Sequence, residues 1–216
     1  MKMNYLIVTG GSVDYEWAKS WLSGRKYEYV IAADSGLEHV KALGLKPDYI
    51  LGDYDSVKPK VLELYSDSTE TVVYPKEKDF TDTHLAILAA INRGAQYIDI
   101  IGATGTRLDH MLTNINVCKA ALQAQVQCCI YDSNNKIYLV DDNETKRIKR
   151  EEQYGKYVSI IPLTEKVTLS LSGFKYPLDN YELKQGLSIC QSNEIADETA
   201  AINIHSGVAV VIEARD

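Results

Sequence analysis

Residues 29–56, YVIAADSGLEHVKALGLKPDYILGDYDS, decide the fold class of the first part of the chain. The apolar runs at 29–33 and 48–51 have the length of buried strands, and the segment 36–43 between them has helical spacing. A strand, a helix and a second strand in close succession predict a βαβ unit with parallel strands. The stretch therefore predicts an α/β domain.

The same alternation continues outward from this stretch to about residue 140. We expect buried strands at 5–8, 29–33, 48–51, 71–74, 97–101, 127–131 and 136–140. We expect helices near 13–22, 36–43, 58–65, 82–93 and 109–124. These elements predict an N-terminal Rossmann-like, three-layer α/β domain with a mainly parallel sheet over residues 1–140.

The pattern changes after residue 140. Residues 141–153, DDNETKRIKREEQ, are charged and polar, which predicts a solvated hairpin or linker. Beyond them the helical spacing ends, and short runs are separated by Gly, Pro and Asn turn signals. We expect strands at 157–162, 167–171, 187–191, 200–204 and 208–213. They predict a smaller second domain over residues 147–216, an all-β sandwich.

The composition is that of a globular protein with an acidic balance. Of the 216 residues 45% are apolar, and the net charge is −7 without a basic stripe, so we expect no nucleic-acid partner. The cysteines lack zinc-ligand spacing and suit buried positions; they are Cys118, Cys128, Cys129 and Cys190. No signal-peptide pattern and no apolar run of about 18 residues occurs, so we expect a cytoplasmic protein without a membrane partner.

Polar residues follow the expected carboxyl ends of the strands, the edge at which parallel sheets bind ligands. After the first strand, Gly10 and Gly11 suit a phosphate or a tight turn, and the turn is the stronger interpretation of this pair alone. After the second strand, Asp34 suits a helix cap as well as a functional role. These two junctions are ambiguous when each is taken alone.

Asp53 and Asp55 follow the third strand in the loop GDYDS. Two carboxylates at this spacing can converge on a hard cation such as Mg²⁺, which prefers carboxylate oxygens, water and phosphate. They can equally form a solvated turn in which Asp55 or Ser56 caps the following helix. The motif taken alone does not decide between the two.

The segment KEKDFTDT at 76–83 follows the fourth strand. Thr81 or Asp79 suits the N-cap of the next helix, Lys78 suits a phosphate, and Asp82 suits the metal site of Asp53 and Asp55. Acidic residues are also ordinary in the first turn of a helix, so this segment taken alone leaves both interpretations of Asp82 open.

The segment GATGTRLDH at 102–110 follows the fifth strand. Thr104 offers a hydroxyl to phosphate and Arg107 a planar fork of donors, while Asp109 suits either orienting Arg107 or capping the next helix. His110 is more often a packing or capping residue than a base, and we do not place it in the site. Together the junctions predict a metal–phosphate site for a phosphorylated nucleotide. Walker, dinucleotide-binding and nucleophile-elbow motifs do not occur.

These segments resemble the thiamine pyrophosphokinase (thiamine diphosphokinase) family in its bacterial form. The matching segments are ADSG at 33–36, LGLKPDYILGDYDS at 43–56, YPKEKDFTDTHLAI at 74–87, GATGTRLDHMLTNI at 102–115, GFKYPLDNYELKQG at 173–186 and SNE at 192–194. The resemblance implies transfer of the diphosphoryl group of ATP to the thiamine hydroxyl, with AMP released. It also implies Mg²⁺ and a homodimer with thiamine bound at the subunit interface.

The resemblance also assigns roles to individual residues. It implies catalytic or metal-binding roles for Asp53, Asp55, Asp82, Arg107 and Asp109. It implies that the nucleotide and its phosphates contact Asp34, Lys78, Thr81, Thr104 and Arg107. It implies that thiamine contacts Tyr176, Ser192 and Asn193. Asp82 and Asp109 are both open as the group that accepts the hydroxyl proton.

Other functions fit part of the pattern. The Asp-x-Asp motif at 53–55 also suits a metal-dependent nucleotide-sugar glycosyltransferase, which leaves the junctions at 76–83 and 102–110 unexplained. A pterin-type diphosphokinase would transfer the same group to another alcohol. A non-catalytic nucleotide sensor would bind ATP without turnover.

Overall fold

The computed structural model describes residues 3–53, 61, 63–65, 69–75, 77, 79–105, 107–142 and 144–216. The chain divides into two compact units, residues 1–133 and 134–216. In the described part, no helix combines the length and the apolar character needed to cross a membrane.

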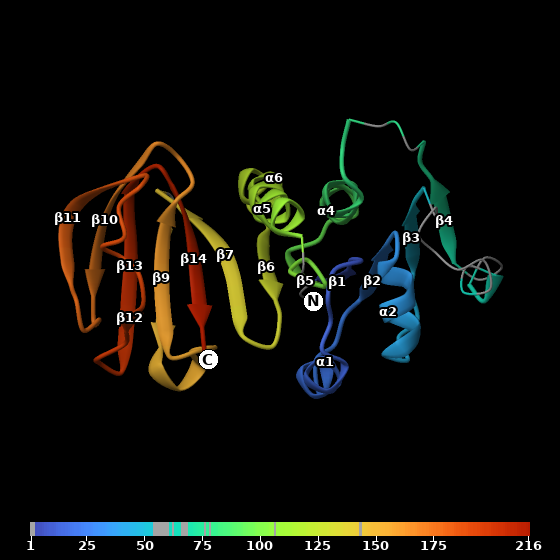
Figure 1. Ribbon diagram of the computed structural model, residues 1–216, viewed down its shortest axis with the longest axis horizontal. Helices are drawn as coiled ribbons and strands as arrows, with labels where there is room; N and C mark the ends of the chain where they lie inside the picture. Colours follow the sequence, from blue (N-terminus) through green and yellow to red (C-terminus); the bar gives the residue numbers. More distant parts are fainter. Residues whose placement is uncertain are drawn as a thin grey trace. The chain divides into compact units, whose positions relative to one another are not determined.

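The first unit is an α/β structure built on a parallel sheet (Figure 1). Its strands are β1 (Asn4–Val8), β2 (Tyr29–Ala33), β3 (Tyr49–Gly52), β4 (Glu70–Val73), β5 (Tyr97–Ile101) and β6 (Gln127–Tyr131). Its helices are α1 (Tyr15–Leu22), α2 (Gly36–Ala42), α4 (Asp82–Asn92), α5 (Leu108–Val117) and α6 (Lys119–Gln123). The strands lie in the order β6-β5-β1-β2-β3-β4, and every recorded pair is parallel.

The apolar runs predicted as strands form the core of this unit. Leu6, Ile31, Ile50 and Ile100 are fully buried, because helices pack on the sheet and leave its central strands no solvent-facing side. In Figure 1, α1 and α2 lie on one side of these strands and α4, α5 and α6 on the other. The mainly parallel sheet is thus confirmed.

Strand order creates a switch point between β1 and β5. The chain runs outward from β1 through β2, β3 and β4, and then returns to β5 on the other side of β1. The segments that follow β1 and β5 therefore leave the sheet in opposite directions, which opens a crevice at their carboxyl ends.

The second unit consists of antiparallel strands (Figure 1). They are β7 (Asn135–Asp141), β8 (Thr145–Lys149), β9 (Tyr157–Pro162), β10 (Lys166–Ser172), β11 (Leu178–Lys184), β12 (Asn193–Glu194), β13 (Thr199–Ser206) and β14 (Val208–Ala214), with a 3₁₀ turn at Arg150–Glu152. The orders are β12-β9-β14-β7 and β11-β10-β13-β8. β7 contacts β13, so the two sets of strands meet within this unit.

Several sequence-based expectations for the strands are wrong. Residues 187–191 form no strand: Leu187 and Ile189 are exposed, and only Cys190 is buried. The predicted linker 141–153 contains β8, which pairs with β13 and buries Ile148. β11 was not predicted, because Leu183 is its only buried side chain.

Other elements differ in their extent. The strand predicted at 136–140 is β7, which pairs with β14 and belongs to the second unit. The helix predicted at 109–124 is two helices separated at Cys118, since the Cys118 backbone ends α5 and begins α6. The helix predicted at 58–65 falls largely outside the described residues.

Candidate functional site

A pocket of about 680 Å³ opens at the carboxyl ends of the strands, beside the switch point between β1 and β5. Its walls come from the segments after β1, β2, β3 and β5 and from the starts of α4 and α5. The predicted residues that line it are Asp34, Asp53, Thr81, Asp82, Thr104, Arg107 and Asp109. Asp55 and Lys78 lie outside the described residues. The shared edge predicted from the sequence therefore exists.

The glycine segment after β1 packs directly on the segment after β5. The backbone N–H of Gly11 donates to Gly102 O at 2.7 Å, and that of Ser12 donates to Thr104 O at 3.0 Å. A Cβ on Gly11 would lie 2.3 Å from Gly102 O, so only glycine permits this approach. These two donors hold the loops together, which agrees with the tight-turn interpretation of the glycine pair.

Asp34 occupies a strained and partly buried position. Its φ of 50° lies in the left-handed region, and its backbone N–H donates to Leu51 O. The carboxylate Oδ1 is buried, and no described residue offers it a hydrogen bond, while Oδ2 accepts from Ser35. Burial, together with the charges of Asp82 and Asp53, raises the pKa of Asp34 above its ordinary value. Backbone strain and an unpaired carboxylate oxygen are features of a binding site.

Replacement of Asp34 by Asn should stabilise the protein at neutral pH. The raised pKa means that the ionised carboxylate destabilises the folded state above that pKa, and Asn tolerates the left-handed backbone. We expect the free energy of unfolding at pH 7 to rise by about 0.5–1 kcal/mol. The gain should shrink as the pH falls from the raised pKa toward about 4, and it should be absent below about 4, where Asp is protonated in both states. Denaturant unfolding at several pH values measures this.

Asp48→Asn is the matched control for Asp34→Asn. The Asp48 carboxylate accepts the Val30 N–H at 2.9 Å, so it already has the partner that Asp34 Oδ1 lacks. We expect no gain in stability from Asp48→Asn. A loss of stability in Asp34→Asn at pH 7 would contradict this account.

The first turn of α4 faces the pocket. Thr81 is the N-cap of this helix and accepts the backbone N–H of His84 at 3.3 Å, so the predicted cap is confirmed. Asp82 and the buried Thr83 follow directly and line the pocket. The positive end of the helix dipole is therefore directed at the space where an anionic ligand would lie.

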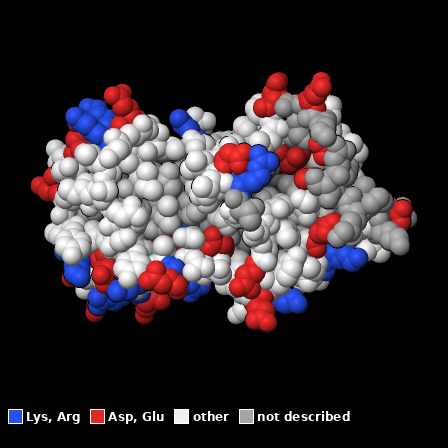
Figure 2. Space-filling model, in the orientation of Figure 1, with Lys and Arg blue, Asp and Glu red and all other residues white. Residues whose placement is uncertain are grey.

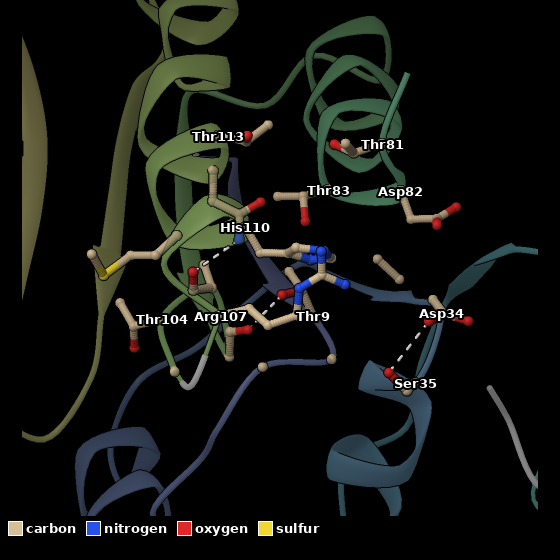
Figure 3. A pocket seen from close by; sticks show the side chains of 18 of the residues that line it. Thr9, Asp34, Ser35, Thr81, Asp82, Thr83, Thr104, Arg107, His110 and Thr113 are labelled. Carbon is tan, nitrogen blue, oxygen red and sulfur yellow. Dashed lines mark hydrogen bonds between the residues drawn. The ribbon is translucent and has the colours of Figure 1, made fainter. Parts of the chain in front are cut away.

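Two acidic side chains of the pocket, Asp53 and Asp82, lie within electrostatic range of Asp34. Asp82 and Asp53 both raise the pKa of Asp34, and Figure 3 shows Asp34 and Asp82 on the same side. Within the described ranges, no group of three side chains has metal-ligand geometry. Carboxylates that repel one another and a buried oxygen without a partner do fit a hard cation in their chemistry.

Arg107 follows β5, and in Figure 3 its side chain lies apart from those of Asp34 and Asp82. Its Nε donates to Asp109 Oδ1 at 3.2 Å, and its terminal nitrogen donates to Asp109 Oδ2 at 2.5 Å. Of the two roles open to Asp109, the structure therefore shows the orienting one. Most of the guanidinium remains exposed, so it can also contact a ligand.

The Arg107–Asp109 pair should be visible in an acid titration. The hydrogen bonds from Arg107 lower the pKa of Asp109 to about 2. We expect Arg107→Gln to return this pKa toward about 4, the ordinary aspartate value. Because the pKa of the folded protein is depressed, the pair stabilises the fold above about pH 4 and loses that effect as the pH falls toward 2. Carboxyl-carbon NMR titration measures both values, and equal values in the two proteins would contradict the pairing.

Sequence reasoning missed part of the pocket lining. Phe80, His110, Met111 and Asn114 all contribute to the lining. The buried Asn114 amide donates to Ala103 O at 2.8 Å and so supports the loop after β5. The spacing of 110, 111 and 114 on one helix was the available signal, but it required knowing which face of α5 is directed at the pocket.

Tyr176, Ser192 and Asn193 lie close together in the second unit. The Asn193 side chain accepts from Tyr176 N at 3.1 Å and donates to Tyr176 O at 2.8 Å, so its amide holds the Tyr176 backbone. Ser192 has a φ of 53°, and its N–H donates to Ser159 Oγ. The Tyr176 ring is exposed.

Comparison with known proteins gives a consistent result. The family model described as thiamin pyrophosphokinase, catalytic domain, matches residues 22–130, and the one described as thiamin pyrophosphokinase, vitamin B1 binding domain, matches residues 145–209. Thiamine pyrophosphokinase of Bacillus subtilis is 31% identical over 188 residues, covering 86% of this chain and 87% of that protein. Thiamine pyrophosphokinase 1 of Oryza sativa is 30% identical over 181 residues, covering 79% of this chain and 67% of that protein.

Solved structures agree with the sequence comparison. The crystal structure of the Bacillus subtilis thiamine pyrophosphokinase superimposes with a TM-score of 0.87 at 28% identity, covering 99% of each chain. A thiamin pyrophosphokinase family protein from Enterococcus faecalis gives a TM-score of 0.82 at 29% identity, again covering 99% of each chain.

Proposed function

The chain belongs to the thiamin pyrophosphokinase family and is an enzyme that makes thiamine diphosphate, and we propose that it transfers the diphosphoryl group of ATP to the thiamine hydroxyl in the pocket beside β1 and β5. The observation that carries this proposal is the pocket itself. It has carboxylates on one side, an arginine on another and the start of α4 directed into it. Such a site suits a polyphosphate bound with a cation.

In this proposal Asp53 and Asp82, with Asp55, hold Mg²⁺. The buried Asp34 oxygen, to which the described residues offer no hydrogen bond, and the effect of the Asp53 and Asp82 charges on Asp34 support a cation there. When bound, Mg²⁺ supplies positive charge to the ATP phosphates.

The remaining pocket residues would bind and orient the reacting groups. Arg107, with Lys78, stabilises negative charge on the transferring group and on the departing AMP. Thr81 and Thr104 contribute donors beside the phosphates, and Asp34 lies beside the nucleotide. Catalysis then rests on positioning and electrostatics.

Asp109 is poorly suited to accept the thiamine hydroxyl proton. Both Asp109 oxygens already accept from Arg107, and the lowered pKa of Asp109 makes it a weak base. Asp109 therefore serves by orienting Arg107.

The thiamine site is proposed to involve Tyr176, Ser192 and Asn193. Since Asn193 binds the Tyr176 backbone, its part would be to hold Tyr176 in place for a ligand ring. We further propose, from the resemblance of the sequence motifs, a homodimer with thiamine at the subunit interface.

The finer architecture belongs to the same proposal. We infer a Rossmann-like, three-layer catalytic domain over residues 1–140 and a β-sandwich thiamine-binding and dimerisation domain over 147–216. The helices on both sides of the parallel sheet support the first assignment. Because β7 pairs with β14 in the second unit, the boundary is better placed near residue 133 than at residue 140. A cytoplasmic location stays a prediction from the sequence.

An AMP-coupled assay tests the proposed reaction. With ATP, Mg²⁺ and thiamine we expect AMP to form, and without thiamine we expect only background. AMP formation with a pterin alcohol in place of thiamine would favour the pterin-type diphosphokinase. Release of a nucleoside diphosphate from a nucleotide sugar would favour the glycosyltransferase. ATP binding without turnover of any alcohol would favour the sensor.

The distribution of surface charge agrees with a small anionic substrate rather than with a duplex nucleic acid. On the face drawn in Figure 2, among the residues it describes, basic side chains stand in small groups beside acidic ones. A duplex nucleic acid would need a continuous basic stripe.

A further inference from the structure

A chain of hydrogen bonds connects α1 and α2 to the glycine segment behind the pocket. His39, on α2, makes a hydrogen bond between its Nε2 and Gly11 O at 2.8 Å. Its Nδ1 is 2.8 Å from the hydroxyl of Tyr15, the first residue of α1. Gly11 lines the pocket, whereas His39 and Tyr15 are not among its lining residues.

The hydrogen bond to Gly11 determines which tautomer the neutral imidazole adopts. A carbonyl oxygen can only accept, so Nε2 of His39 carries a hydrogen and donates it to Gly11 O. In the neutral ring Nδ1 is then an acceptor, and the Tyr15 hydroxyl donates to it. Tyr15 thus favours the tautomer that holds Gly11.

The position of Gly11 determines the position of the segment after β5. Gly11 N and Ser12 N donate to Gly102 O and Thr104 O, and the Thr9 hydroxyl donates to Gly102 O at 2.7 Å. Contact is so close that a Cβ on Gly105 would lie 2.8 Å from Ser12 N. A shift of the first segment therefore moves the second, which leads into Arg107.

The helix that carries His39 also begins at the carboxylate side of the pocket. Asp34 and Ser35 directly precede α2, and a Cβ on Gly10 would meet Ser35 Oγ at 1.9 Å. The short helix α2 therefore directly follows Asp34 at its start and is joined through His39 to the segments that lead to Arg107. The separation between the two charged sides depends on this attachment.

We propose that His39, oriented by Tyr15, is a positioning residue that sets the distance between the carboxylates and Arg107 during diphosphoryl transfer. This inference rests on the proposed function. Diphosphoryl transfer needs the carboxylates and Arg107 to be correctly placed around the phosphates at the same time. Small misplacements of such groups slow catalysis strongly. ATP binding depends less on this placement, because Arg107 alone attracts the phosphates and the carboxylates alone attract their cation.

The test separates turnover from binding. We expect His39→Leu to lower kcat by about 10- to 100-fold while the Kd for ATP changes less than about threefold. His39→Gln, which can still donate to Gly11 O, should keep kcat within about threefold of the wild type. Tyr15→Phe removes only the hydroxyl, and we expect a loss of about two- to tenfold. Matched controls are His205→Leu and Tyr5→Phe, whose side chains do not line or support the pocket.

Amide hydrogen exchange gives a readout that does not depend on activity. In His39→Leu, the Gly11 and Ser12 amides should exchange faster while those of β1 stay protected. Unchanged kcat and exchange in a folded His39→Leu would overturn the inference, as would an equal loss of kcat in His39→Gln. If wild-type protein formed no AMP the proposed function would fail, while the exchange of Gly11 and Ser12 would still test the attachment.

Discussion

Asp82→Asn should reduce thiamine-dependent AMP formation by at least about 10³-fold and leave the fold intact. Asp82 begins α4, lines the pocket and adds to the negative charge around Asp34. The amide cannot neutralise a cation or accept a proton, yet it has nearly the same shape. We expect Asp53→Asn to have an effect of the same order. AMP-coupled turnover measures the loss, and thermal unfolding checks the fold.

Asp14→Asn is the control for these two variants. The Asp14 side chain caps α1 by accepting from the N–H groups of Glu16 and Trp17, and it does not line the pocket. Asn is also a good N-cap, so we expect normal turnover. Near-normal turnover in a folded Asp53→Asn, Asp82→Asn double variant would refute the assignment of these carboxylates to the metal–phosphate site.

Arg107→Ala should lower kcat/KM by about 10²- to 10³-fold, the second-largest effect that we expect. The guanidinium is held by Asp109 through two hydrogen bonds and leaves its remaining donors exposed at the pocket. Arg107→Lys should restore little, since an ammonium group cannot reproduce a planar fork of donors. Steady-state kinetics with ATP as the varied substrate measures both variants.

Asp109→Asn separates the charge of Arg107 from its orientation. It keeps the guanidinium but weakens the pair, so we expect a smaller loss, about tenfold. If Arg107→Ala were as active as the wild type, or if Asp109→Asn were the more damaging change, Arg107 would not carry the charge of the transferring group.

The α/β part of the fold could be predicted because its strands are continuous apolar runs. The runs at 29–33 and 48–51 appear as β2 and β3 within one residue, with α2 between them. Strands of this kind are buried on both faces of the sheet, so the continuous apolar residues of the sequence are enough to identify them. The antiparallel part was harder. The polar β11 buries only Leu183, while the apolar stretch at 187–191 forms no strand.

The location of the candidate site could be predicted from the sequence, but the backbone conformations and contacts of its residues could not. The carboxyl-end rule brought Asp34, Asp53, Asp82 and Arg107 to one pocket, although each of the three aspartates alone suited a helix cap or a turn. Nothing in the sequence indicated the left-handed backbone of Asp34, because that conformation depends on the contact with Leu51. The attachment of His39 to Gly11 likewise depends on how α2 lies against the loop after β1.

The most direct test of the central claim follows the phosphates of ATP into the products. Protein, Mg²⁺, thiamine and ATP labelled in the γ-phosphate are incubated, and the products are separated. The account predicts that the label appears in thiamine diphosphate, with one unlabelled AMP formed for each thiamine diphosphate, and that Asp82→Asn forms neither. Formation of ADP with labelled thiamine monophosphate, or no transfer of label to thiamine, would contradict it.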